Sequence, residues 1–181
     1  MRLLHAGSLR TSALAVTAAA ALACTGAGSW PPEGQGPCAD GVVPADTSSP
    51  SLEEAQRQVP FPIAYPCRLP TGFRLQRVLV SGSQEGSRSL TLVFSRPGFD
   101  TNLELTESER AIGFTVVPPT MTLTRPLVQG VQGRLVEGDS GTGHYLLYLA
   151  WSKGGVSYEL QSTVGAGLTR DGFLPIAESI R

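Results

Sequence analysis

A hairpin pattern between residues 143 and 163 constrains the fold of this chain more than any other stretch. Apolar side chains alternate along residues 145–151 and again along residues 156–160, which is the period of strands that place one face on a core. Between them, Gly154 and Gly155 accept the positive φ angles of a tight turn. The first strand is apolar on its other face as well, as expected of a strand with both faces covered. We therefore expect this strand to lie inside an antiparallel sheet rather than at its edge.

Further strand-like stretches precede the hairpin and predict a meander of antiparallel strands. They are residues 73–81, 88–95, 101–106 and 131–137. The apolar phase of the first stretch switches across Arg77, which predicts a β-bulge. Prolines interrupt residues 107–129, so the sequence predicts either an edge strand or a long loop there.

Two helices are predicted to flank these strands. Ser51 and Glu54 have the spacing of a capping box, which predicts a short helix after them. Thr169 is a suitable N-cap for a C-terminal helix, in which Pro175 predicts a kink or a late start near Phe173. The expected fold class is therefore α+β: an antiparallel sheet of about five to seven strands, with the C-terminal helix packed on one face and a short N-terminal helix.

Residues 1–23 predict a signal peptide rather than a transmembrane helix. Arg2 and Arg10 belong to a charged start, and the apolar run after them has 13 residues, whereas a membrane-spanning helix needs about 20. Residues 24–50 are rich in Gly, Pro and Ser and are predicted to be a flexible tether. Residues 51–181 are predicted to form a single α+β domain.

Cys24 follows small residues at which a leader would be cut. The stretch Ala21-Leu22-Ala23-Cys24 resembles the lipobox of bacterial lipoproteins, in which a diacylglycerol is attached to the cysteine thiol. The commonest lipobox has leucine three places before the cysteine, whereas here Ala21 and Leu22 are exchanged. The resemblance implies a lipid anchor on Cys24, with the protein facing the extracytoplasmic side of the cell membrane. The alternative is a secreted protein that is cut near Ala23 or Ala27.

The charge balance argues against a nucleic-acid partner. The chain carries 14 Lys and Arg and 15 Asp and Glu, and loss of Arg2 and Arg10 with the leader leaves 12 basic residues against 15 acidic ones. Nucleic-acid-binding proteins gather a basic excess on one face, whereas the basic residues here are scattered along the sequence. The expected partners are the membrane, through the lipid, and an unidentified envelope protein or small ligand.

The two other cysteines, Cys38 and Cys67, are expected to form a disulfide if Cys24 carries the lipid, because an extracytoplasmic compartment is oxidising. The bridge would close a loop of about 30 residues and stabilise the fold by roughly 3.5 kcal/mol. A metal site with two thiolate ligands is the alternative, but the Cys-x-x-Cys spacing and nearby histidine of such sites are missing. No metal or cofactor is expected.

Residues 138–141 (GDSG) resemble the sequence around the nucleophile of trypsin-like serine proteases. Nucleophilic catalysis also needs a base and an acid that orients it. His144 lies four residues after Ser140, whereas that family places its histidine far upstream, and the chain is too short for its two β-barrels. The stretch is therefore expected to be a turn between two strands.

Several carboxylates are candidates for catalytic or cation-binding groups. Glu104, Glu107 and Glu109 could form a glycosidase pair or a cation site, but carboxylates where strands end usually keep a surface soluble. Glu137 and Asp139 are expected in a flexible turn, which is a poor base for a metal site.

Two other patterns have both a functional and a structural interpretation. Residues 165–167 (GAG) lack the third glycine of a nucleotide-binding loop and are expected to be a linker. Trp151 and Tyr158 could form an aromatic binding patch, but a pair across the hairpin in the core is the expected role.

Residues 51–181 resemble a domain of unknown function that recurs in bacterial lipoproteins and in the extracytoplasmic parts of membrane-anchored sigma-factor regulators. The residues that carry the resemblance are Pro66, Leu69, Pro70, Gly72, Phe73, Gly133, Trp151, Tyr158, Ala177, Glu178, Ser179 and Ile180. It implies an α+β fold outside the membrane and carries no catalytic residue. The chain lacks the cytoplasmic domain and membrane helix of those regulators.

The sequence therefore predicts a non-enzymatic lipoprotein of the cell envelope, with a binding, sensing or regulatory role and an unknown ligand. The alternative is an envelope hydrolase that uses Ser140 or the surface carboxylates.

Overall fold

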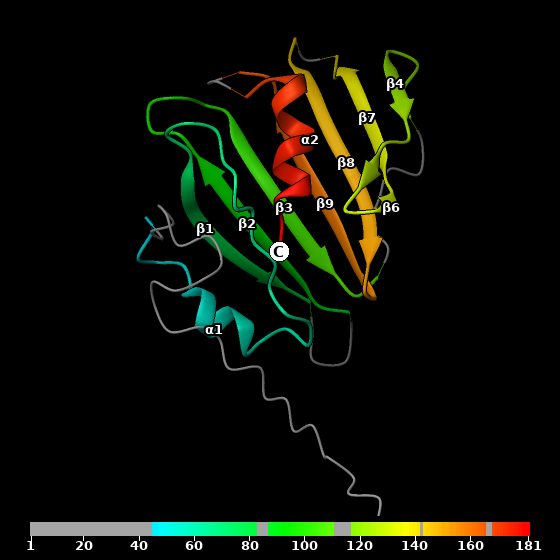
Figure 1. The fold of residues 1–181 in the computed structure, drawn as a ribbon. Coiled ribbons are helices and arrows are strands. Elements are labelled where there is room, and N and C mark those ends of the chain that lie inside the picture. Colours follow the sequence, from blue (N-terminus) through cyan, green and yellow to red (C-terminus); the bar gives the residue numbers. More distant parts are fainter. Residues whose placement is uncertain (1–44, 83–86, 111–116, 142, 166–167) are drawn as a thin grey trace, which may run out of the picture.

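The computed structural model describes residues 45–82, 87–110, 117–141, 143–165 and 168–181. Seven strands form one antiparallel sheet in the order β1-β2-β3-β9-β8-β7-β4 (Figure 1). Their bounds are Arg74–Ser81 (β1), Ser89–Ser95 (β2), Asn102–Ser108 (β3), Met121–Thr124 (β4), Arg134–Asp139 (β7), Tyr145–Lys153 (β8) and Val156–Thr163 (β9). A short ribbon pairs β5 (Leu127–Val128) with β6 (Val131–Gln132), and the helices are α1 (Leu52–Gln56) and α2 (Arg170–Glu178).

The hairpin predicted from the sequence is formed by β8 and β9. Lys153 pairs with Val156, and the two residues between them, Gly154 and Gly155, have φ angles of 61° and 83°. The β8 strand lies between β9 and β7, so its predicted place inside the sheet is confirmed. The alternation along residues 156–160 predicts that Ser157 faces water, but it is buried and its hydroxyl lies 3.0 Å from that of Ser152 across the hairpin.

The predicted meander is also present. The register of β1 against β2 shifts between Leu75 and Arg77, which confirms the predicted bulge. The single strand expected over residues 131–137 is instead divided at Gly133 into β6 and β7. A Cβ atom at Gly133 would lie 3.2 Å from side-chain atoms of both Leu149 and Val128, so the chain passes close to the core there.

Both predicted helices are present, but the C-terminal helix does not start late near Phe173. The Ser51 side chain accepts the amide of Glu54 and the Glu54 carboxylate accepts that of Ser51, which confirms the capping box. The late start of α2 near Phe173 is wrong, because Thr169 caps the helix by accepting the amide of Gly172 and the helix begins at Arg170. Pro175 inside α2 removes one helical hydrogen bond, and the helix continues past it.

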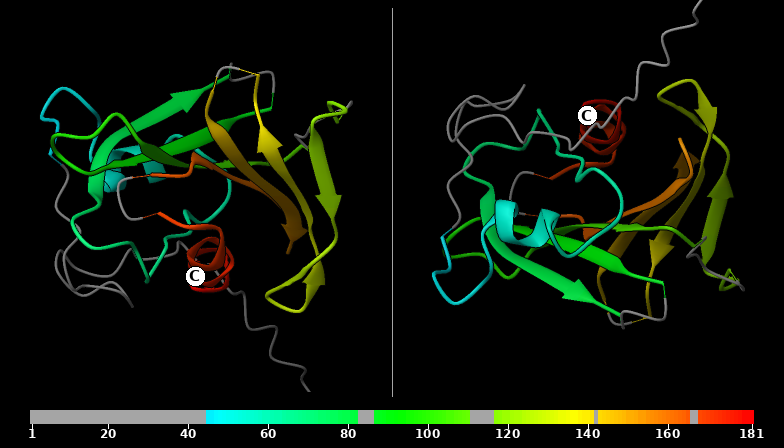
Figure 2. Two further views of the ribbon diagram at one scale, coloured as in Figure 1. Left: turned by 90° about the horizontal axis from the view of Figure 1, so that it is seen from above. Right: turned by 90° about the horizontal axis from the view of Figure 1, so that it is seen from below.

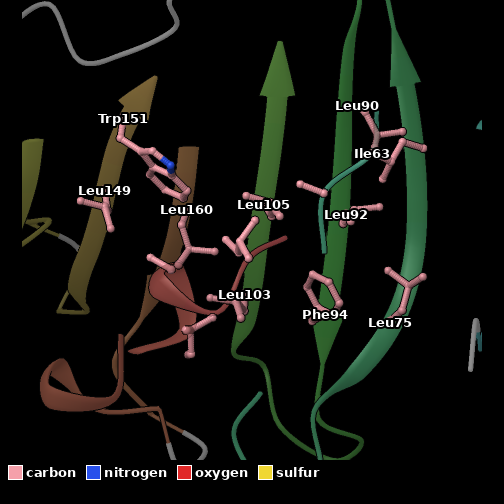
Figure 3. Close-up of a cluster of buried hydrophobic side chains, with 14 of the residues drawn as sticks. Ile63, Leu75, Leu90, Leu92, Phe94, Leu103, Leu105, Leu149, Trp151 and Leu160 are labelled. Carbon is pink, nitrogen blue, oxygen red and sulfur yellow. The ribbon is translucent and has the colours of Figure 1, made fainter. Parts of the chain in front are cut away.

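The core lies between one face of the sheet and α2. Phe173, Ile176 and Ala177 of α2 are buried in the same cluster as the inward leucines of the strands. Figure 2 shows the sheet curving around α2, and Figure 3 shows Leu103 and Leu105 of β3 beside Leu160 of the neighbouring β9 on this face. The structure thus confirms a mostly antiparallel sheet with a C-terminal helix and one short helix.

The proline-rich connector before β1 pairs with the end of the chain. The amide of Tyr65 donates to the carbonyl of Arg181 (2.9 Å), the amide of Cys67 donates to that of Ser179 (3.2 Å), and Pro66 forms a bridge with Ile180. These contacts hold the segment around Cys67 against the residues that follow α2.

Candidate functional site

Some of the predicted site residues lie outside the described part of the chain. These are Cys24, Cys38, the whole of the predicted signal peptide and most of the predicted tether. Cys67 is among the described residues and is exposed. Because Cys38 is not among them, the pairing of these two cysteines stays a prediction. The final residues of the predicted tether contact the sheet, because the amide of Ala45 donates to the carbonyl of Leu75 in β1 (3.1 Å).

Ser140 lies directly after β7, in an exposed turn. Its hydroxyl and its amide both lie 3.0 Å from the backbone carbonyl of His144 and donate to it. Asp139 accepts the amide of Gly141 (2.8 Å), as is common in Gly/Asp/Ser turns. These contacts close the turn, and the His144 carbonyl that accepts from the Ser140 hydroxyl cannot act as a catalytic base.

The three carboxylates of β3 and its end differ in environment. Glu109 is exposed, and Glu104 is half-buried and accepts a hydrogen bond from the Gln161 amide (2.8 Å). The expectation of a surface carboxylate is wrong for Glu107, which is 0% exposed. The reason is the strand period: Glu107 follows Leu103 and Leu105 on the face that packs into the core.

Burial gives Glu107 an unusual protonation equilibrium. Its carboxyl group accepts the amide of Ala64 at 3.0 and 3.2 Å, and it lies between Leu90 and Tyr158 on the neighbouring strands. Within the described residues, no Lys, Arg or His forms an ion pair with it. Loss of hydration therefore outweighs the single amide bond and raises the pKa of the Glu107 carboxyl to about 8.

Glu137 also departs from expectation. It lies in β7 rather than in a flexible turn, and it is 2% exposed. The guanidinium group of Arg170, at the start of α2, donates to both of its carboxylate oxygens at 2.5 Å. This bidentate pair attaches the first turn of α2 to the sheet, so the structure gives Glu137 a positioning role.

Trp151 and Tyr158 form the cross-strand pair predicted from the hairpin. Their rings stack with centroids 5.2 Å apart, and Trp151 is 4% exposed. The indole NH of Trp151 and the hydroxyl of Tyr65 are buried without a hydrogen-bond partner among the described residues. The burial of Trp151 confirms a core role and contradicts an exposed aromatic patch.

A hollow of about 580 Å³ lies at one end of β1, β2 and β3. Arg74, Arg77 and Arg96 line it, together with Asp46 and the exposed ring of Phe99, and we call it the arginine hollow. Its residues come from the segment before α1, from β1, from the adjoining ends of β2 and β3, and from the turn between those two strands.

The charge of the arginine hollow is positive. Asp46 is the one carboxylate among its lining residues, whereas three of them are arginines. Hydrogen bonds from the Ser48 hydroxyl (2.6 Å) and amide (2.9 Å) hold the pKa of Asp46 below its usual value, with a smaller effect from the charge of Arg77. Asp46 is thus ionised and already bonded, which leaves an excess of positive charge for a ligand.

The sequence analysis did not predict this hollow, because the basic residues are scattered along the sequence. They are separated along the chain, but the pairing of β1 with β2 brings Arg74 beside Ser95, next to Arg96. The available signal was the position of arginines at the matching ends of two strands predicted to pair.

Comparison of the chain with protein-family models, with curated proteins and with solved structures finds no match. Of the described helices, none is long and apolar enough to cross a membrane. The described residues contain no group of three or more His, Cys, Asp or Glu side chains that could hold a metal ion.

Proposed function

We propose that this chain is a non-enzymatic binding or sensing module of the cell envelope, held by a lipid on Cys24 at the extracytoplasmic side of the membrane. The observation that carries the binding role is the arginine hollow, because three arginines and only one carboxylate line the same open depression. The membrane attachment rests on the sequence around Cys24.

The chemistry of the arginine hollow favours binding over catalysis. A guanidinium group stays protonated at all physiological pH values, so it can hold an anion but cannot exchange a proton. The remaining acid, Asp46, has a lowered pKa and accepts two hydrogen bonds from Ser48, which makes it a weak base. General acid–base catalysis needs a group with a pKa near the working pH, and no lining residue of this hollow supplies one.

The binding role is tested by capture from an envelope extract. A Cys24→Ser protein that carries both Arg74→Glu and Arg77→Glu should retain less material than Cys24→Ser alone, since the charge of the hollow is reversed. Arg125→Glu is the matched control, because Arg125 is exposed and follows β4 at the opposite edge of the sheet. Equal retention by all of these proteins would contradict a binding role for the hollow.

Lipidation predicts that the native protein partitions into the detergent phase. Acyl chains contribute roughly 0.8 kcal/mol per buried methylene, so two or more chains anchor a protein stably. Cys24→Ser should move the protein to the aqueous phase. Wild-type protein in the culture medium with an N-terminus beyond Cys24 would show that the anchor is not used.

A disulfide between Cys38 and Cys67 predicts that thiol reagents leave both residues unlabelled in denatured, unreduced mature protein. After reduction, both should react. Full labelling of both before reduction would refute the bridge, and mass spectrometry of the peptides identifies the partner of each cysteine.

Ser140→Ala is expected to change stability by less than about 0.5 kcal/mol, because the hydroxyl lies in an exposed turn. The Ser140 amide keeps the turn closed by donating to the His144 carbonyl. The Ser140 hydroxyl should not react with a fluorophosphonate probe. Stoichiometric labelling of this serine would instead favour the envelope hydrolase.

A further inference from the structure

A second hollow, of about 460 Å³, adjoins the arginine hollow. Arg68, from the connector before β1, lines it, and so do Thr169 and Gly172 from the first turn of α2. Arg96 lines both hollows. The two depressions therefore meet at one side chain, and we call the second one the α2 hollow.

The combined charge of the two hollows is strongly positive. Four arginines and one carboxylate line them, although acidic residues slightly outnumber basic ones in the whole chain. Among the described residues, the side chains of Arg68, Arg74 and Arg77 form no ion pair or hydrogen bond. Like charges gathered in concave surfaces raise the local concentration of the opposite charge, so these hollows attract anions.

The shared arginine is held in place by its surroundings. The guanidinium carbon of Arg96 lies 4.4 Å from the centroid of the Phe99 ring, which attracts the cation through its π face. On another side, a Cβ atom at Gly72 would lie 3.3 Å from Nε of Arg96, so the chain passes close to this side chain. A side chain already ordered by such contacts loses less entropy when it binds a ligand.

The chemistry of arginine defines the class of ligand. A guanidinium group presents a planar fork of donors that matches the paired oxygens of phosphate or carboxylate groups. The start of α2 adds to the attraction, because the first amides of a helix carry partial positive charge. A singly charged anion would neutralise only part of the charge in either hollow, because the arginines that line each one exceed its carboxylates by two.

We infer that the two hollows form one site for a ligand with at least two anionic groups, of the phosphate or carboxylate kind, and that Arg96 lies between the two groups. This inference rests on the proposed binding role and specifies its ligand. The α2 hollow is also lined by the half-buried apolar side chains of Leu69 and Pro175, which leave room for an uncharged portion of the same molecule.

Isothermal titration of the Cys24→Ser protein with pyrophosphate and with a tricarboxylate tests the inference and separates the two chemistries. In about 150 mM NaCl, where exposed charges are screened beyond about 8 Å, at least one of these ligands should bind saturably. Arg96→Ala should weaken that binding at least about tenfold, which corresponds to about 1.4 kcal/mol. Arg96→Lys, which keeps the charge but not the fork, should give an intermediate affinity.

Two further variants locate the second anionic group. Arg68→Ala and the double change Arg74→Ala with Arg77→Ala should each weaken binding, whereas Arg125→Ala at the opposite sheet edge should not. Unfolding curves of all variants show whether a loss of affinity reflects a loss of structure.

The inference fails if neither ligand binds, or if Arg125→Ala weakens binding as much as Arg96→Ala does. It also fails if folded Arg96→Ala protein binds as tightly as the parent. If neither ligand binds, continued capture of envelope material through Arg74 and Arg77 would preserve the binding role and exclude this class of ligand, whereas the other two results would show that the ligand does not bind through Arg96. If neither ligand binds and the arginine hollow also captures no envelope material, the proposed function is wrong as well.

Discussion

The free energy of unfolding is expected to fall by roughly 3–5 kcal/mol as the pH rises from about 4.5 to about 8, because of Glu107. Burial raises the pKa of this carboxyl from an ordinary value of 4.5 to about 8. The folded state therefore holds the proton more tightly than the unfolded state. The stabilisation is complete below the unfolded pKa and is lost as the pH rises through the folded one. Asp46 and Glu54 have lowered pKa values, so their titration affects stability below this window.

Glu107→Gln tests this assignment. The amide cannot ionise and can still accept the Ala64 amide, so the variant should lose most of the pH dependence and be more stable than wild type above about pH 8. Urea unfolding at several pH values measures the difference, and Glu109→Gln is the matched control at an exposed carboxylate of the same region. Wild-type stability that rises between pH 5 and pH 8 would show that Glu107 is not buried in its protonated form.

Trp151→Ala is expected to cost about 3–5 kcal/mol, because it empties the largest side-chain volume of the hairpin core. Trp151 is 4% exposed and stacks on Tyr158, so its removal also leaves one face of that ring without a partner. Domains are commonly stable by only about 5–15 kcal/mol, so this variant should be largely unfolded or degraded. A denaturant curve with an unshifted midpoint would contradict a core role.

Trp151→Phe distinguishes volume from polarity. The indole NH is buried without a partner among the described residues, so phenylalanine removes an unsatisfied donor while it keeps an aromatic ring on Tyr158. We expect this variant to lose less than half as much stability as Trp151→Ala. Leu127→Ala, at a side chain that is 71% exposed, is the control and should change stability by less than about 0.5 kcal/mol.

Much of the fold could be predicted because its signals are local. The alternation of residues 145–151, the glycines of the following turn and the phase switch at Arg77 all act over a few residues, and each predicted feature is present. The division of the strand at Gly133 was missed, since it depends on the approach of Leu149 from another strand. The N-cap predicted at Thr169 is present, and the late start near Phe173 was wrong because this cap outweighs the single bond that Pro175 removes.

The site was harder to predict because its residues meet only in the folded chain. Glu107 was expected on the surface and Glu137 in a flexible turn, although their positions in the alternation after Leu105 and Leu135 place them on the core face. Here the period of the strand predicted burial better than the polarity of the side chain. The arginine hollow has no local signal of this kind, since Arg96 joins Arg74 and Arg77 only through the pairing of β1 with β2.

Site-specific photo-crosslinking in intact cells tests the proposed binding role most directly. A photoreactive residue at Asn102, which is exposed and lines the arginine hollow, should crosslink to an envelope component. The same residue at Thr124, exposed on β4 at the opposite sheet edge, should not. The Asn102 product should disappear when Arg74 and Arg77 are both replaced by glutamate. Equal crosslinking at the two positions, or a product that survives the charge reversal, would contradict the proposal that this hollow binds the ligand.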